Sequence, residues 1–135
     1  ILYIEDNPSN FELVKRILVR NPAFRLLSAA IQGGLGLELA AEHKPDLILL
    51  DLNLPDMSGE EVLRRLRSDP EVAQIPVVVI TAGASKGQRE RLLATRRRSA
   101  TARFEGLFRH ARHASIDWTS ASAADNGLRL LELRL

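Results

Sequence analysis

Acidic residues follow two apolar runs of this chain, at the positions where buried strands would end. Glu5 and Asp6 come directly after residues 1–4, and Asp51 comes directly after residues 47–50. Carboxylates brought to one edge of a sheet repel one another and raise each other's proton affinity unless a cation lies between them. Mg²⁺ suits such a group because it takes oxygen ligands octahedrally and keeps several of its waters. A carboxylate beside that ion can attack a phosphorus centre, so the spacing predicts a cation site with phosphoryl chemistry.

The elements that bring these carboxylates together can be predicted from the periodicity of residues 1–93. Short apolar runs alternate with segments of helical period, which is typical of βαβ units around a parallel sheet. The expected strands cover residues 1–4, 25–29, 46–52 and 76–80. Ligands of an open parallel sheet bind beyond the carboxyl ends of its strands. Glu5, Asp6, Asp51 and Thr81 fall at such ends, so we expect them at one edge of an α/β fold.

Residues 53–59 form the expected loop after the central strand. Ser58 and Glu61 have the spacing of a capping box for the helix that follows. Asp56, in the same loop, is expected to be a turn residue rather than a ligand. Lys86 follows the next loop and is expected to be a surface residue at the start of a helix.

Three motifs of the chain resemble the receiver domain of two-component response regulators. They are Tyr3-Ile4-Glu5-Asp6-Asn7-Pro8, Leu49-Leu50-Asp51-Leu52-Asn53-Leu54-Pro55-Asp56-Met57-Ser58-Gly59 and Val78-Val79-Ile80-Thr81-Ala82. The resemblance covers residues 1–93 and implies a flavodoxin-like, doubly wound parallel sheet with the strand order 2-1-3-4-5. The opening motif is especially similar to receivers attached to hybrid sensor histidine kinases.

The resemblance implies a metal site with Mg²⁺ as the cofactor. Asp51 is similar to the phosphoacceptor of the family and Asp6 to its direct metal ligand. Glu5 is similar to the outer acidic residue that reaches the metal through water. Asn53 matches the position whose backbone carbonyl completes the metal shell.

The remaining matches concern the phosphoryl pocket. Thr81 matches the hydroxyl that reorients towards the phosphoryl group, and Ala82 matches the small residue that leaves the pocket open. Receivers also carry a Lys-Pro pair after the fifth strand and an aromatic residue just before it, and residues 99–104 of this chain contain no such pair. Arg103 supplies a positive charge there, but a planar guanidinium is a poor replacement for a compact ammonium.

Residues 94–135 differ in composition from the receiver core of residues 1–93. No Lys follows Lys86, and this C-terminal segment holds eight Arg against four acidic residues. We expect an atypical basic segment in which the fifth strand and last helix are absent, displaced or built from residues such as Ala114–Trp118. One hypothesis is that a frameshift or a comparable gene error changed the sequence after about Ala94, and the other is that the segment is native. Translation of the coding DNA in the other two frames would decide between them.

Length and composition indicate one domain without disulfides. The 135 residues include no Cys, and the formal net charge is +2. No apolar stretch approaches the roughly 20 residues that span a bilayer, and no signal peptide precedes Ile1. We therefore expect a cytoplasmic protein without membrane contact from this segment, and a solvated basic surface rather than direct nucleic-acid binding. The start without Met indicates a piece of a longer protein, with a membrane-anchored hybrid kinase as one such parent.

Two functions remain open from the sequence. The first is a phosphoacceptor receiver domain that takes a phosphoryl group from a histidine kinase or phosphotransfer domain onto Asp51 with Mg²⁺, as a regulatory domain rather than an enzyme. The alternative is a degenerate receiver that binds a partner protein without a working phosphorylation switch. A hydrolase with an aspartyl nucleophile is a distant third, because Asn53 stands where such an enzyme needs an acid aspartate. The cognate kinase, the output and the choice between monomer and dimer are left open.

Overall fold

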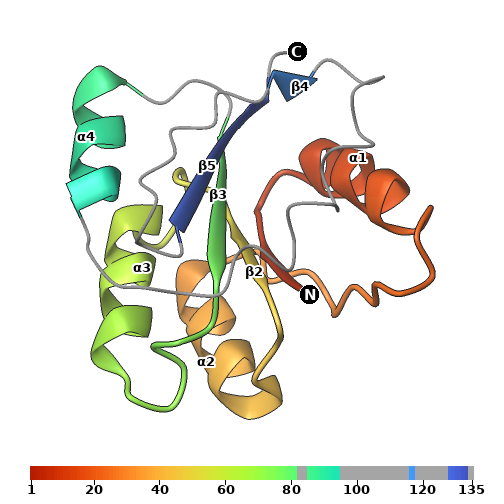
Figure 1. Cartoon of the computed structure of the whole chain (residues 1–135), viewed down its shortest axis with the longest axis horizontal. Coiled ribbons are helices and arrows are strands. Elements are labelled where there is room, and N and C mark those ends of the chain that lie inside the picture. The colour runs from red at the N-terminus through yellow and green to blue at the C-terminus, as the bar shows by residue number, and fades with distance from the viewer. Residues whose placement is uncertain (82–84, 95–115, 118–127, 134–135) are drawn as a thin grey trace.

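The computed structural model describes residues 1–81, 85–94, 116–117 and 128–133. Within these ranges, one sheet lies between helices on its two faces (Figure 1). The elements in chain order are β1 (Leu2–Ile4), α1 (Pro8–Leu18), α2 (Gly33–His43), β2 (Ile48–Leu50), α3 (Gly59–Ser68), β3 (Val77–Thr81), α4 (Lys86–Ala94), β4 (Ile116–Asp117) and β5 (Leu128–Leu133).

The sheet has the strand order β1-β2-β3-β5-β4. The pairs β1–β2, β2–β3 and β3–β5 are parallel, whereas β4 runs antiparallel to β5. The register aligns Ile4 with Leu50 and Leu50 with Val79. The first two strands therefore end level with each other, so the residues that follow them come out at the same edge of the sheet.

Two apolar clusters form the core, one on each face of the sheet. Tyr3 and Leu49 pack with Val14 and Leu18 of α1, whereas their neighbours Ile4 and Leu50 lie in the second cluster with residues of α2 and α3. This division follows from the strand geometry, because successive side chains point to opposite faces. In Figure 1, α1 covers one face and α2 and α3 cover the other. The arrangement is doubly wound and confirms the expected α/β fold class.

Helix α1 begins at Pro8, directly after a capping residue, Asn7. Asn7 is its N-cap, and the Asn7 side-chain oxygen accepts hydrogen bonds from the backbone N–H of Ser9 at 2.9 Å and of Asn10 at 3.3 Å. Pro8 takes the first helical position, where its missing N–H costs no hydrogen bond. The cap fixes the direction in which the chain leaves the acidic residues at the end of β1.

The second expected strand, residues 25–29, is not a regular strand, and that prediction is wrong in extent. The segment runs along the outer edge of β1 and forms one parallel bridge, between Ala30 and Ile4. Backbone hydrogen bonds link Leu27 to Ile1 and Ala30 to Tyr3. An edge segment has a pairing partner on one side only, and these few bonds do not make a continuous ladder. Its place beside β1 still agrees with the expected strand order.

The position of the fifth strand, beside β3, is filled by β5. Its parallel register runs from Val77 opposite Leu128 to Thr81 opposite Glu132. Residues 114–118, which we expected as a replacement for this strand, contribute the two residues of β4 on the outer side of β5. Displacement of the fifth strand was one of three expected outcomes, and residues 128–133 were not the residues expected to form it. The two residues of β4 offer too few hydrogen bonds for the inner position. Residues 99–103 lie outside the described part of the chain.

Helix α4 contacts α3 through an ion pair between helices. The Arg91 guanidinium donates two hydrogen bonds of 3.1 Å to the Glu60 carboxylate. Lys86 is the first residue of α4 and its side chain is 90% exposed, as expected for a surface residue. Among the described helices, none combines the length and apolar character that a membrane span requires.

Candidate functional site

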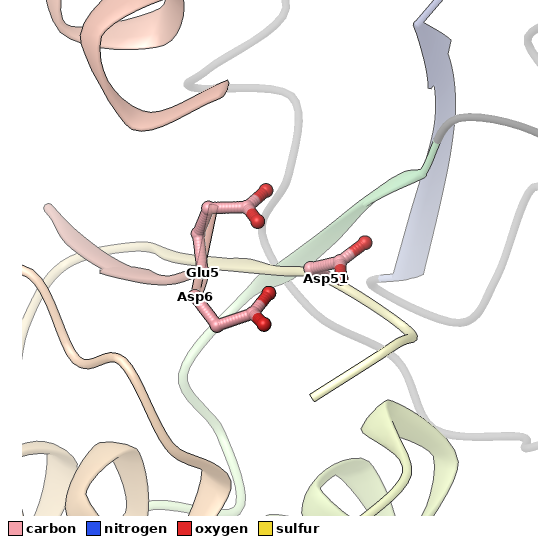
Figure 2. Close-up of side chains that lie close together, drawn as sticks. All are labelled: Glu5, Asp6 and Asp51. Atoms are coloured by element: carbon pink, nitrogen blue, oxygen red, sulfur yellow. The ribbon is translucent and has the colours of Figure 1, made fainter. Parts of the chain in front are cut away.

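The carboxylates of Glu5, Asp6 and Asp51 converge at the carboxyl ends of β1 and β2 (Figure 2). One oxygen from each of the three side chains lies within 4.8 Å of the other two. Glu5 and Asp51 are buried, whereas Asp6 is exposed. The structure thus brings together the three acidic residues that the sequence singles out.

Backbone hydrogen bonds that continue past the strands hold these residues in register. The N–H of Asp51 donates to the Ile4 carbonyl at 2.9 Å, and the N–H of Glu5 donates to the Ala30 carbonyl at 2.9 Å. The backbone positions of Glu5 and Asp51 are therefore set by the parallel ladder. A carboxylate placed by a sheet is held more precisely than one carried by a long loop.

The Glu5 carboxylate is buried among hydrogen-bond donors. Its Oε2 accepts hydrogen bonds from the Tyr3 hydroxyl at 3.0 Å and from the Asn10 side-chain amide at 3.3 Å. Its Oε1 accepts one from the backbone N–H of Asn7 at 2.9 Å. These donors come from β1 and from the start of α1, so the first helix takes part in orienting the acidic group.

The Asp51 carboxylate is fixed by the loop that follows β2. Its Oδ2 accepts a hydrogen bond of 3.0 Å from the backbone N–H of Asn53. The backbone N–H of Leu52 also acts on this carboxyl and lowers its pKa. Because Oδ2 is engaged with Asn53, Oδ1 is the oxygen more available for an ion or an electrophile.

Burial makes the negative charge of this group costly. Burial is the main cause that raises the pKa of Glu5, and the charge of Asp51 raises this pKa further. The hydrogen bond from the Asn7 N–H acts in the opposite direction and lowers it. Burial likewise raises the pKa of Asp51, and the charge of Asp6 adds to that effect, against the N–H groups of Asn53 and Leu52. A bound cation would offset both causes, because an opposite charge favours the ionised carboxylates.

The loop after Asp51 returns close to the Asp51 backbone at Gly59. Its N–H donates a 2.9 Å hydrogen bond to the Leu52 carbonyl. A Cβ atom at residue 59 would collide with the backbone carbonyl of Asp51 and with the Cα of Leu52. Glycine is therefore required here by space, because the start of α3 rests on the backbone that carries Asp51.

The expected capping box at the start of α3 is only half formed. The Ser58 hydroxyl accepts a hydrogen bond of 3.2 Å from the Glu61 backbone N–H. The Glu61 carboxylate does not return to the Ser58 backbone but accepts hydrogen bonds from Arg64 and Arg65, each at 2.7 Å. The Glu61 carboxylate binds the two guanidinium groups one turn along the helix rather than the Ser58 N–H, because hydrogen bonds between charged partners are stronger than a bond to a neutral N–H.

The other expected site residues are placed only in part. Asn53 is exposed in the loop after β2 and forms an isolated bridge with Ser58. Thr81 is the last residue of β3, at the same edge of the sheet as the acidic group. Ala82 and Arg103 lie outside the described residues, so their roles stay predictions.

Sequence reasoning missed Tyr3 and Asn10, which both contact Glu5. A signal for Tyr3 was present, since residues two apart on a strand point to the same face and Tyr3 precedes Glu5 by two. Asn10 lies in the first turn of α1, three residues after the N-cap Asn7. Its contact with Glu5 depends on how the helix leaves the strand, which the pattern of residues does not specify.

The donor set of the acidic group fits a divalent cation with oxygen ligands. Carboxylate oxygens are the ligands that Mg²⁺ and Mn²⁺ take, and no thiolate or imidazole is part of the group. Two of the three carboxylates are buried with raised pKa values, which an ion would lower. The chemistry of the residues therefore matches a hard divalent ion at this edge of the sheet.

Comparison with known proteins gives relatives along the same stretch of chain. A family model described as the response regulator receiver domain matches residues 1–98. The polar-differentiation response regulator DivK of Brucella anthropi is 42% identical over 93 residues, which cover 68% of this chain and 73% of that protein. DivK of Brucella ovis matches to the same extent.

Solved structures of similar fold include a metal-bound and a phosphorylated response regulator. The Mn²⁺-bound form of the response regulator Rcp1 has a TM-score of 0.61 and 31% identity, over 67% of this chain and 70% of that chain. The phosphorylated cyanobacterial phytochrome response regulator RcpA has a TM-score of 0.58 and 30% identity over the same shares.

A doubly wound sheet with acidic strand ends, together with these matches, identifies a signalling domain of the two-component type. The chain belongs to the family of response regulator receiver domains. The finer resemblance to receivers of hybrid sensor histidine kinases stays a prediction.

Proposed function

We propose that this chain is a phosphoacceptor domain that receives a phosphoryl group on Asp51 in a Mg²⁺-dependent reaction. The donor is a histidine kinase or a histidine phosphotransfer domain. The chain thereby acts as a regulatory domain in a cytoplasmic phosphorelay and not as an enzyme that turns over an external substrate.

The convergence of Glu5, Asp6 and Asp51 within 4.8 Å carries this proposal. Buried carboxylates so close together destabilise the folded chain when no counter-ion is present. A bound cation would remove this repulsion and stabilise the fold. An interaction module without phosphorylation has no need for this arrangement. The intact acidic group therefore favours the phosphoacceptor over the degenerate receiver.

The ion would be held by Asp6, Asp51 and the backbone carbonyl of Asn53, with Glu5 in contact through water. When bound, it neutralises negative charge on the oxygens of the incoming phosphoryl group. These ligand roles rest on the match to the family motifs and on the donor chemistry of the group.

The chemical step is a phosphoryl transfer between two protein side chains. Asp51 Oδ1 attacks the phosphorus atom of a phosphohistidine, and the bond between that phosphorus and the imidazole nitrogen breaks as the new P–O bond forms. The electron pair of the broken bond goes to the imidazole. The Asn53 N–H keeps Oδ2 turned away from the attack, so one oxygen serves as the nucleophile.

Thr81 and Ala82 complete the proposed pocket. Thr81 ends β3, and its hydroxyl would donate a hydrogen bond to a phosphoryl oxygen after transfer. Ala82 would leave room for that group because its side chain is a single methyl. Both roles come from the resemblance to the family.

The proposal is tested by phosphorylation with acetyl phosphate, followed by intact mass spectrometry. We expect one added phosphate in the presence of Mg²⁺ and none when EDTA removes the ion. Asp51→Asn should abolish the addition. Asp56→Asn serves as the matched control, because it makes the same change of carboxylate to amide in the same loop and should leave phosphorylation intact. Phosphorylation that persists in Asp51→Asn, or phosphorylation that is unchanged by EDTA, would overturn the assignment.

A further inference from the structure

The oxygens of Glu5 have almost no hydrogen-bonding capacity left. An ionised carboxylate has about four lone-pair sites, two on each oxygen. The Tyr3 hydroxyl and the Asn10 amide occupy both sites of Oε2, at 3.0 and 3.3 Å. The Asn7 N–H occupies one site of Oε1 at 2.9 Å. Glu5 therefore keeps one free lone pair, on Oε1, with which to meet an ion or its water.

The donors on Oε2 are themselves held in place. Tyr3 is fully buried, and its ring stacks on that of Phe11 with the centroids 5.8 Å apart and the planes 18° from parallel. Asn10 lies in the first turn of α1, three residues after the N-cap Asn7. Because an ionised carboxylate only accepts hydrogen bonds, the Asn10 group that faces Glu5 is its NH₂. Glu5 thus cannot rotate freely to present both oxygens.

We infer that Tyr3 and Asn10 are positioning residues that limit Glu5 to a single contact with the bound ion, and that they thereby favour Mg²⁺ over Ca²⁺. This inference rests on the proposed function, because it concerns the ion that assists phosphoryl transfer. Both residues contact the Glu5 carboxylate and would act on the ion through it.

The selectivity follows from the coordination that each ion prefers. Ca²⁺ takes six to eight oxygens at longer distances and commonly uses a carboxylate with both oxygens at once. Mg²⁺ demands near-ideal octahedral geometry and keeps several waters. The one free lone pair of Glu5 can accept a hydrogen bond from a water that Mg²⁺ keeps. Ca²⁺ would gain from direct contact with both Glu5 oxygens, and the two donors on Oε2 prevent that contact. Removal of one of the two donors would free one lone pair of Oε2 for Ca²⁺.

The experiment measures the dissociation constants of Mg²⁺ and Ca²⁺ by isothermal titration calorimetry on the whole chain. The variants are Tyr3→Phe, which keeps the ring and removes only the hydroxyl, and Asn10→Ala. Phe11→Leu is the matched control, because it disturbs the packing of Tyr3 without removing a donor from Glu5. We expect the preference for Mg²⁺ over Ca²⁺ to fall by about threefold or more in both variants and to stay unchanged in the control.

The ratio of the two dissociation constants separates positioning from general damage. If the two residues have a merely structural role, the variants should bind both ions more weakly and leave the ratio unchanged. That result would overturn the inference. The proposed function would still stand if the unaltered chain binds Mg²⁺. A ratio that shifts equally in Phe11→Leu would also overturn it. If the unaltered chain binds no Mg²⁺, both proposals fail. Should Tyr3→Phe not fold, as judged by circular dichroism, Asn10→Ala decides the outcome.

Discussion

The Asp56 carboxylate accepts a 2.7 Å hydrogen bond from the backbone N–H of Gly33, the first residue of α2. The second carboxylate oxygen accepts another, of 2.8 Å, from the N–H of Gly34. The N-cap of this helix, Gln32, makes no side-chain capping bond of its own. Asp56 therefore caps α2 from another part of the chain, and it ties the loop after Asp51 to the neighbouring helix.

We expect Asp56→Ala to lower the melting temperature by about 2–5 °C, because two N–H groups at the start of α2 lose their acceptor. These hydrogen bonds lower the pKa of Asp56. The stabilisation is therefore present above the ordinary Asp pKa and is lost as the pH falls through the lowered value. Thermal melts at neutral and acidic pH check this, with Asp56→Asn as a control that keeps one acceptor. An equal loss at both pH values would contradict the charge-assisted cap.

Gly59→Ala should destabilise the chain by roughly 1–3 kcal/mol and weaken Mg²⁺ binding. The added methyl group would collide with backbone atoms of Asp51 and Leu52, which cannot rotate away as a side chain would. Urea unfolding and a Mg²⁺ titration measure the two effects. Gly87→Ala is the control, because a Cβ at that position meets Arg91 Nη1 at an ordinary 3.5 Å. Equal stability of the two variants would refute the crowding at Gly59.

The stability of the cation-free chain should depend on pH through Glu5 and Asp51. Both pKa values are raised in the folded state, chiefly by burial, so the native chain binds more protons than the unfolded chain between the ordinary and the raised values. Their contribution to the free energy of unfolding therefore falls as the pH rises through this window. The size is on the order of 1 kcal/mol for each unit by which a pKa differs.

Urea unfolding in EDTA at a series of pH values measures this dependence. Other carboxylates titrate in the same range, so the quantity of interest is the difference between the unaltered chain and Glu5→Gln. The free energy of unfolding of Glu5→Gln should exceed that of the unaltered chain by more as the pH rises. Added Mg²⁺ should reduce this excess. A difference that does not change with pH would show that Glu5 keeps its ordinary pKa.

Asp51→Asn should stabilise the cation-free chain by on the order of 1 kcal/mol while it removes phosphorylation. The amide is nearly isosteric, and its oxygen can still accept the hydrogen bond from the Asn53 N–H. The variant loses one buried negative charge beside Glu5 and Asp6. The gain should vanish in saturating Mg²⁺, because only the unaltered chain then gains the full benefit of the ion. A lower melting temperature for Asp51→Asn in EDTA would argue against charge repulsion in the group.

The acidic group was predictable because the pair Glu5-Asp6 and the single residue Asp51 each come at the end of an apolar run. Parallel strands bring such positions to one edge whatever their separation along the chain, so Asp51 could be placed beside Glu5 from pattern alone. The contacts that orient the group were not predictable in the same way. The Asn10 contact with Glu5 depends on the path of α1, and the Asp56 cap joins residues that lie more than twenty positions apart.

The edges of the sheet were harder to predict than its centre. Residues 47–50 are apolar without interruption and gave a clear central strand, whereas residues 25–29 mix exposed and half-buried positions. The leucines of residues 128–133 fit neither a helical nor a strand period well, so their place beside β3 could not be inferred. The division of the chain near residue 94 and the frameshift hypothesis stay predictions.

The pairing of β3 with β5 protects an edge of β3 only late in the synthesis of the chain. Until residues 128–133 have been synthesised, one side of β3 presents bare backbone N–H and C=O groups, and its sequence, Val77-Val78-Val79-Ile80, is strongly β-forming. A free apolar edge is a template for strands of other molecules. A chain that stops short of residue 128 would therefore be prone to aggregate during translation, even though its acidic residues had already been made.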